Sequence, residues 1–325
     1  MKKIVLSGMR PTGKLHIGHY VGALENWIKL QDEFQNYHLI ADYHALTTSL
    51  DTSRIYQDTI DMLIDWIASG IDPEKSPVFR QSQIKEHTEL HLIFSNLITS
   101  ARLERNPTVK DQVRDLNIEN ITYGHLGYPV LQAADILLYK GNFVPVGEDQ
   151  VPHIEITREI ARKFNSTWGE VFPEPEPKLT NFARLPGLDG NAKMSKSLNN
   201  ALLISDSEED IKSKLRKAVT DPQKIRKNDP GRPEICLVFT YHKKFNPNEI
   251  ETIEKDCRSG VLGCVSCKMN CSEKISEYFK PIREKRSTLE AKPKLIEEIL
   301  IDGEKRARSK AEETMHEVRA SMKFG

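Results

Sequence analysis

The fold is decided by the stretch at residues 4–19, which reads IVLSGMRPTGKLHIGH. Its first three apolar residues predict a strand, and after a short loop apolar residues recur at helical spacing from Leu15 to about Phe34. Further predicted strands alternate with helical stretches along the first half of the chain, at residues 38–41, 77–79 and 143–146. This alternation predicts an α/β fold with a mostly parallel sheet and helices on both of its faces.

The composition indicates a soluble globular protein. Apolar residues make up 38% of the 325 positions and charged residues 29%, and the 47 basic residues balance the 47 acidic ones. The neutral balance excludes a globally basic nucleic-acid coat protein, although not a local basic patch. No stretch approaches the ~18 consecutive apolar residues of a membrane span, and too few apolar residues follow Lys3 for a signal peptide. We therefore expect a cytoplasmic protein that does not associate with membranes.

The character of the chain changes after Glu170. Prolines at 173, 175 and 177 predict an extended linker, and from Ser207 onward the pattern is helical without strand alternation. Residues 292–323 predict one or two terminal helices, broken at Gly303. We expect an α/β domain at residues 1–200 and a helical domain at 201–290, with the terminal helices at 291–325 packing back on the first domain.

Two histidines mark the junction between the first strand and the first helix. His16 and His19 are three residues apart and so share one helix face, and Gly18 lets a ligand approach the backbone. Ligands of open α/β sheets bind at such junctions, where imidazole donors and a helix N-terminus suit a polyphosphate. The alternative is two surface histidines beside a helix start.

A second motif, Lys193-Met194-Ser195-Lys196-Ser197, follows a loop rich in glycine and proline. Two lysines and two hydroxyls on a loop can close over a phosphate and neutralise charge that develops in a transition state. A solvated basic loop is the alternative for this motif taken alone.

Together the two motifs resemble the signatures of the class I aminoacyl-tRNA synthetases. The residues at 128–137 (YPVLQAADIL) and 147–150 (GEDQ) narrow the resemblance to the bacterial tryptophanyl-tRNA synthetase family, and it extends over essentially the whole chain. It implies a doubly wound, Rossmann-type catalytic domain and an all-helical anticodon-binding domain. It also implies ATP with Mg²⁺, L-tryptophan and tRNA(Trp) as partners, and a homodimer.

The resemblance further assigns residues to the ATP site. His16, His19, Lys193 and Lys196 would be the catalytic cations, and Mg²⁺ would be carried by the ATP. The ATP-binding residues would be Arg10, Pro11, Thr12, Gly18, His19, Gly147, Glu148, Asp149, Leu185, Lys193, Met194, Ser195, Lys196 and Ser197.

Asp135 is the most informative single residue because it lies among apolar residues of a predicted helix, where an unpaired carboxylate is costly. The alternative is an aspartate on a solvated helix face. In the family the matching aspartate accepts the indole N–H of tryptophan. Further candidates for the amino-acid pocket are Tyr128, His44 and Gln150, for which the alternatives are a core tyrosine, a core histidine and a helix cap.

All five cysteines lie between Cys236 and Cys271, with the spacing Cys-x20-Cys-x6-Cys-x2-Cys for the first four. Clustered thiols in a reducing compartment favour a metal centre over disulfides. A subset of the family binds a [4Fe–4S] cluster through four cysteines, but with a first gap two residues longer, so zinc stays open. We expect Cys236, Cys257, Cys264 and Cys267 as ligands and Cys271 as a buried apolar residue.

Two other functions compete with a tryptophan–tRNA ligase. A tyrosyl enzyme is disfavoured by Asp135, by residues 147–150 and by the lysine motif. A non-catalytic RNA-binding or redox-sensing paralogue is disfavoured because both ATP motifs are intact. Exchange of pyrophosphate into ATP that depends on the amino acid would separate the enzyme from the paralogue.

Overall fold

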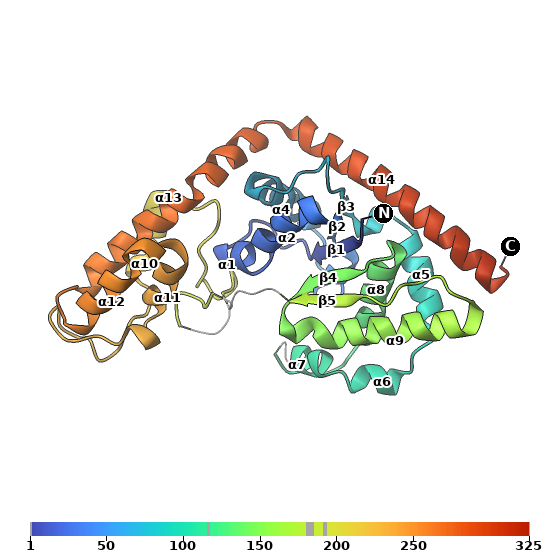
Figure 1. Cartoon of the computed structure of the whole chain (residues 1–325), viewed down its shortest axis with the longest axis horizontal. Coiled ribbons are helices and arrows are strands. Elements are labelled where there is room, and N and C mark those ends of the chain that lie inside the picture. The colour runs from blue at the N-terminus through green and yellow to red at the C-terminus, as the bar shows by residue number, and fades with distance from the viewer. Residues whose placement is uncertain (1, 116–117, 180–184, 191–193, 325) are drawn as a thin grey trace. The chain divides into compact units, whose positions relative to one another are not determined.

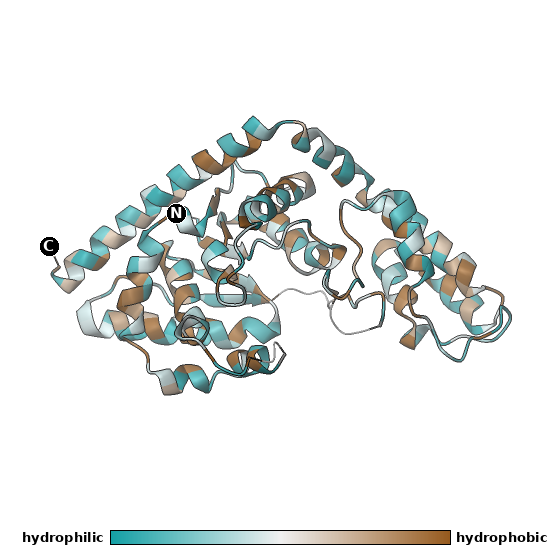
Figure 2. Ribbon diagram, turned by 180° about the vertical axis from the view of Figure 1, so that it is seen from behind, coloured by the Kyte–Doolittle hydropathy of each residue, from teal (hydrophilic) through white to brown (hydrophobic). Residues whose placement is uncertain are grey.

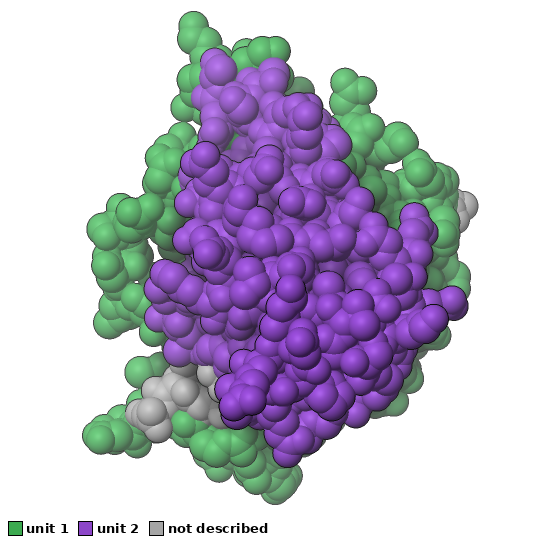
Figure 3. Space-filling model, turned by 90° about the vertical axis from the view of Figure 1, so that its left-hand side faces the viewer, with its two compact units in different colours: residues 1–13, 25–181, 292–325 green, residues 14–24, 182–291 purple. Residues whose placement is uncertain are grey.

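In the computed structural model the chain forms two compact units (Figure 3). The structure describes residues 2–115, 118–179, 185–190 and 194–324. Unit 1 comprises residues 1–13, 25–181 and 292–325, and unit 2 comprises residues 14–24 and 182–291. Among the described helices, none is both long and apolar enough to cross a membrane.

Unit 1 is built on a five-stranded sheet with the order β3-β2-β1-β4-β5 (Figure 1). Each pair of neighbouring strands is parallel, as the sequence predicts. The order reverses between β1 and β4, and this switch point is where ligands bind in doubly wound sheets. The strands are β1 (Ile4–Met9), β2 (Gln35–Ile40), β3 (Val78–Arg80), β4 (Phe143–Val146) and β5 (Glu176–Leu179).

Helices lie on both faces of this sheet. His38 of β2 stacks on Trp27 and lies edge-on to Trp66, whereas Tyr37 and Leu39 beside it belong to the core cluster. Because successive strand residues point to opposite faces, the two tryptophans and the core cluster cover different faces. The helices of unit 1 are α2 (Glu25–Glu33), α3 (Asp42–Ala45), α4 (Ile55–Ser69), α5 (Glu86–Ser95), α6 (Ser100–Glu104), α7 (Pro107–Asp115), α8 (Tyr123–Leu138), α9 (Val151–Trp168) and α14 (Pro293–Met322).

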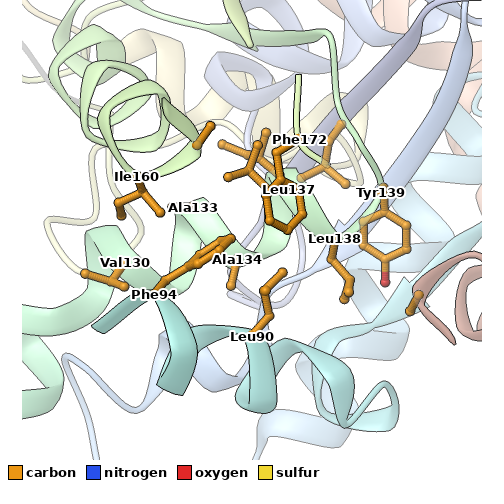
Figure 4. Packing of buried hydrophobic residues seen from close by; sticks show 14 of the residues in the cluster. Leu90, Phe94, Val130, Ala133, Ala134, Leu137, Leu138, Tyr139, Ile160 and Phe172 are labelled. Carbon is orange, nitrogen blue, oxygen red and sulfur yellow. The ribbon is translucent and has the colours of Figure 1, made fainter. Parts of the chain in front are cut away.

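The core cluster is centred on α8, which contributes Val130, Ala133, Ala134 and the apolar residues at 136–138, all buried. In Figure 4, Leu90 and Phe94 of α5 lie against Ala134 and Val130 of α8. At ~25 cal/mol per Å² of apolar surface removed from water, such burial is what holds the sheet and its helices together. Helix α8 is therefore a rigid element, and it is the element that carries Asp135.

Two details differ from the sequence prediction. The proline stretch contains an edge strand, β5, because its residues pair with β4 while proline is tolerated at a sheet edge. The break predicted at Gly303 is wrong, since α14 is one continuous helix (Figure 2) in which charged and apolar residues alternate. Gly303 instead permits close packing: a Cβ there would lie 1.9 Å from the carbonyl oxygen of Val78 in β3.

Unit 2 is helical, as predicted for the chain beyond Ser207. A π-helical segment, Tyr20–Leu24, follows its first short helix. The α-helices of unit 2 are α1 (Ile17–His19), α10 (Glu208–Arg216), α11 (Leu237–Phe245), α12 (Ile250–Arg258) and α13 (Cys264–Glu290). Edge-to-face and tilted ring contacts hold the π-helical segment to α11 and α13; they join Tyr20, Phe245, Tyr278 and Phe279.

Candidate active site

Asp135 lies at the centre of a buried hydrogen-bond network in unit 1. Its side chain is only 4% exposed, so the alternative of a solvated helix face is wrong. His44 Nε2 lies 2.9 Å from Oδ2, while Gln81 Nε2 and His87 Nδ1 each lie 2.7 Å from Oδ1. Three donors on one carboxylate fix its orientation and compensate for the cost of burying its charge.

The surroundings keep Asp135 ionised. Burial by itself raises the pKa of this carboxyl, but the hydrogen bonds from His44 and His87 outweigh burial and hold the pKa well below its ordinary value. His87 Nε2 also lies 2.9 Å from the Tyr139 hydroxyl. If Tyr139 donates to His87, the imidazole carries its proton on Nδ1 and donates it to Asp135. Asp135 is thus a charged acceptor at neutral pH.

Sequence analysis missed Gln81 and His87. Gln81 begins the short 3-10 helix directly after β3, and His87 is the second residue of the helix that follows, α5. Both are fully buried. The signal that was available is their place after the carboxyl end of a predicted parallel strand, the edge at which α/β sheets bind ligands. Gln81 Oε1 has no hydrogen-bond partner in the part of the chain that the structure describes.

The other two residues predicted for the amino-acid pocket, Tyr128 and Gln150, do not contact Asp135 directly and bind neighbouring groups instead. The ring of Tyr128, about two helical turns before Asp135, lies 6.4 Å from the His44 ring, centre to centre. Its hydroxyl lies 2.8 Å from His153 Nε2 of α9, and burial lowers the pKa of His153 to about 4. Gln150, at the start of α9, donates instead to Asp149 at 2.8 Å. The structure therefore joins His44 to Asp135 directly, and Tyr128 and Gln150 to neighbouring groups.

Two predicted ATP segments of unit 1 lie beside the switch point of the sheet. Residues 10–12 follow β1 and residues 147–149 follow β4, and these strands are parallel neighbours. Arg10 donates to the Thr48 hydroxyl at 3.1 Å. Gly147 allows the Asp149 side chain to fold back, because a Cβ at this position would lie 2.7 Å from Asp149 Oδ1.

In unit 2, His16 and His19 form a reciprocal cap at the start of α1. The Nδ1 atom of each accepts from the backbone N–H of the other, at 3.2 and 3.4 Å, and the rings stack with centres 3.6 Å apart. Gly18 makes this stack possible, since a Cβ there would lie 3.0 Å from His16 Nδ1. The pair is therefore an ordered structure and differs from two independent surface side chains.

The lysine motif lies beside this histidine turn, within the same unit. Lys196 Nζ donates to the Lys14 carbonyl at 2.9 Å. Behind the motif, the backbone at Leu202 and Ile204 pairs with Ile17 and Leu15 in antiparallel fashion. Of the predicted residues, Met194 and Leu185 are buried and Ser195 and Ser197 share a hydroxyl–hydroxyl hydrogen bond of 2.9 Å. Lys193 lies outside the described residues.

The four predicted metal ligands are all half-buried free thiols, and Cys271 is buried as expected. Burial, and then the neighbouring Cys236, Cys257 and Cys264, raise the pKa of Cys267 to about 12. The thiols are thus near enough to influence one another electrostatically. Within the described ranges, however, no three His, Cys, Asp or Glu residues are grouped so that they could hold a metal ion.

Comparisons with known proteins show the family and the fold. Residues 2–280 match the family model of the class I tRNA synthetases for W and Y. The chain is 48% identical to a tryptophan–tRNA ligase of Thermotoga maritima, with 98% of each chain covered. It is 44% identical to that of Aquifex aeolicus, over 98% of this chain and 99% of the relative. A crystal structure of tryptophanyl-tRNA synthetase from Campylobacter jejuni, complexed with ADP and tryptophan, has a TM-score of 0.88 at 37% identity and covers 98% of this chain and 99% of that one.

Proposed function

The chain belongs to the class I tRNA synthetases of the tryptophan and tyrosine family and is a tryptophan–tRNA ligase, and on that premise we propose which of its residues carry the reaction. In the first half-reaction the tryptophan carboxylate attacks the α-phosphate of ATP, which gives tryptophanyl-adenylate and pyrophosphate. In the second, a ribose hydroxyl at the 3′ end of tRNA(Trp) takes the tryptophanyl group and releases AMP.

Asp135 accepts the indole N–H in this proposal, and its buried network is the observation that carries the assignment. A charged acceptor held by three donors is already oriented before the substrate arrives. A site built to hydrogen-bond a substrate N–H can reject a ring that lacks the donor by ~10⁴-fold. His44 positions the carboxylate, while Tyr128 and Gln150 are proposed to contact the amino-acid part of tryptophan.

In unit 1, the segments after β1 and β4 are proposed to bind ATP. In unit 2, the histidine turn and the lysine motif are proposed to contact phosphate groups. Catalysis needs no enzyme nucleophile, because positioning and cations that meet the charge of the departing pyrophosphate suffice. His16, His19, Lys193 and Lys196 are the proposed cations. Mg²⁺, bound to the ATP phosphates, would neutralise charge on them, and we assign it no protein ligand.

The substrate assignment is tested by pyrophosphate exchange into ATP with each of the twenty amino acids in turn. Tryptophan is expected to support exchange, and phenylalanine, whose ring lacks a donor, should be lower by ~10⁴-fold. Exchange supported best by tyrosine would overturn the role given to Asp135. Absence of exchange with any amino acid, from protein that is folded, would overturn the assignment of both ATP motifs.

We further propose that the helices between residues 201 and 290 form the anticodon-binding domain for tRNA(Trp). Basic residues such as the half-buried Lys268 are proposed to supply the phosphate contacts that dominate affinity for nucleic acid. The enzyme is proposed to act as a homodimer, and in the cytoplasm, where tRNA is charged for protein synthesis.

Cys236, Cys257, Cys264 and Cys267 are proposed to hold a [4Fe–4S] cluster. Burial, and then the neighbouring cysteines, raise the pKa of Cys257 and of Cys267. Four thiols are the donor set that such a cluster requires, and the positive charge of iron would compensate for the charge of the thiolates that ligation forms. The cluster would stabilise unit 2 and supply no chemistry to adenylate formation. A structural zinc uses the same thiolates and is the alternative.

Metal analysis of protein purified without oxygen tests this proposal. We expect about four irons per chain and a brown colour that bleaches in air, both lost in Cys264→Ser. Cys271→Ser, a matched change at the thiol outside the proposed set, is expected to keep the iron. Pyrophosphate exchange should be equal in all three proteins. One zinc per chain, or no metal in the wild type, would contradict the cluster.

A further inference from the structure

Asn200 closes the loop that carries the lysine motif. It is 2% exposed and follows the motif by three residues. Its side-chain oxygen accepts from the Ser195 backbone N–H at 2.7 Å, and its amide nitrogen donates to Asp189 Oδ1 at 2.9 Å. Its carbonyl accepts from the Leu188 N–H at 2.8 Å. One residue thus binds both the segment before the motif and the motif itself.

The chemistry of these partners leaves one orientation for the amide. A backbone N–H can only donate, and an ionised carboxylate can only accept, so the oxygen must face Ser195 and the nitrogen must face Asp189. Asparagine is suited to the position because it presents one acceptor and one donor from a short side chain. Aspartate at position 200 would set two carboxylates against each other.

Gly187 makes room for this bond. A Cβ at position 187 would lie 2.2 Å from Asn200 Nδ2 and 2.8 Å from Asp189 Oδ1. Both distances are far below van der Waals contact, so any other residue here would displace the amide or the carboxylate. Gly187, Asp189 and Asn200 are therefore all required for the hydrogen bond between Asn200 Nδ2 and Asp189 Oδ1.

We propose that Asn200 is the positioning residue for the lysine motif during adenylate formation. The bond to Ser195 fixes the backbone next to Lys196, whose ammonium group reaches the Lys14 carbonyl beside the histidine turn. Asn200 acts through the loop and does not contact the reacting atoms. The bond from Asn200 to the loop holds Lys196 in place. Because a displacement of ~1 Å can cost ~10²-fold in rate, loss of this bond is expected to lower kcat. The inference rests on the role proposed above for Lys196.

The test exchanges the two side chains. Asn200→Asp is expected to lower kcat for pyrophosphate exchange by about 10–100-fold, with the KM for tryptophan within about twofold of wild type. Asp189→Asn is the matched control and should stay within about threefold, because the new amide can turn its oxygen toward Asn200. The double variant Asn200→Asp, Asp189→Asn restores one donor and one acceptor and is expected to recover kcat to within about threefold.

Thermal unfolding of each variant shows whether it is folded. A double variant that is folded yet as slow as Asn200→Asp would overturn the proposal, as would Asn200→Asp with wild-type kcat. A raised KM for tryptophan at unchanged kcat would overturn it too, because that is loss of substrate binding. The role of the lysine motif is tested separately by Lys196→Ala. If Lys196→Ala is slow but the double variant does not recover kcat, the proposal for Asn200 is wrong and the role of Lys196 stands.

Discussion

Asp135→Ala is expected to lose tryptophan activation by at least ~10³-fold in kcat/KM, while its affinity for ATP stays close to that of the wild type. A hydrogen bond to a charged group contributes ~1.5–3 kcal/mol, and each buried donor left without a partner costs ~1–3 kcal/mol more. Asp135→Ala removes the acceptor of the indole N–H and also leaves Gln81 and His87 facing an empty space. Steady-state pyrophosphate exchange measures the loss, and calorimetric titration with ATP measures the retained affinity.

Asp135→Asn separates recognition from folding, because it keeps the shape of the side chain and one acceptor oxygen. It should unfold near the wild-type temperature and lose less activity than Asp135→Ala. The low pKa of Asp135 implies that the carboxylate stays charged as the pH falls toward 5, so the KM for tryptophan should not follow a titration of this residue. Nearly normal exchange by Asp135→Ala would remove Asp135 from the site.

Lys196→Ala should lower kcat for adenylate formation by ~10²–10³-fold with little change in the KM for tryptophan. Its charge matters most as pyrophosphate departs, and loss of one preorganised electrostatic group of this kind typically has an effect of that size. Pre-steady-state measurement of adenylate formation gives kcat for this step directly. Lys212→Ala, at an exposed lysine of α10, is the matched control and should behave as the wild type.

The opposite pattern would contradict this role. If Lys196→Ala raised the KM for tryptophan and left kcat unchanged, the lysine would bind the ground state and transition state equally well. It would then be a substrate-binding residue. The proposed role in the departure of pyrophosphate would be wrong.

Asp135 shows how much of a buried site the sequence pattern alone can predict. A carboxylate within an apolar helix predicts a buried group with partners, because burial of an unpaired charge is too costly to be tolerated. The pattern says that partners exist without saying which residues they are. His87 and Gln81 are 48 and 54 residues away along the chain, and the three meet only because β3 and α8 pack into the same core.

The loop that carries the lysine motif shows the same difference between what the sequence predicts and what the tertiary structure decides. The motif at 193–197 can be recognised in the sequence by its residue types, whereas Asn200 and Gly187 are ordinary loop residues in the sequence. Their importance comes from a hydrogen bond and a close approach that exist only once the two segments of the loop lie together. Gly303 was misread for a related reason, since a glycine predicts a helix break when its neighbours are unknown.

By itself, the sequence determined the alternation of strands and helices, the parallel sheet, the helical second half and the two motifs that we propose for the ATP site. These features are local or periodic, so the spacing of apolar residues and the chemistry of short segments are enough to specify them. Only the tertiary structure decided which donors hold Asp135, that His16 and His19 cap each other, and that Lys196 reaches Lys14. Some of those contacts join residues that are distant in the chain, and others require one particular backbone conformation. Both are fixed by the packing of the whole core.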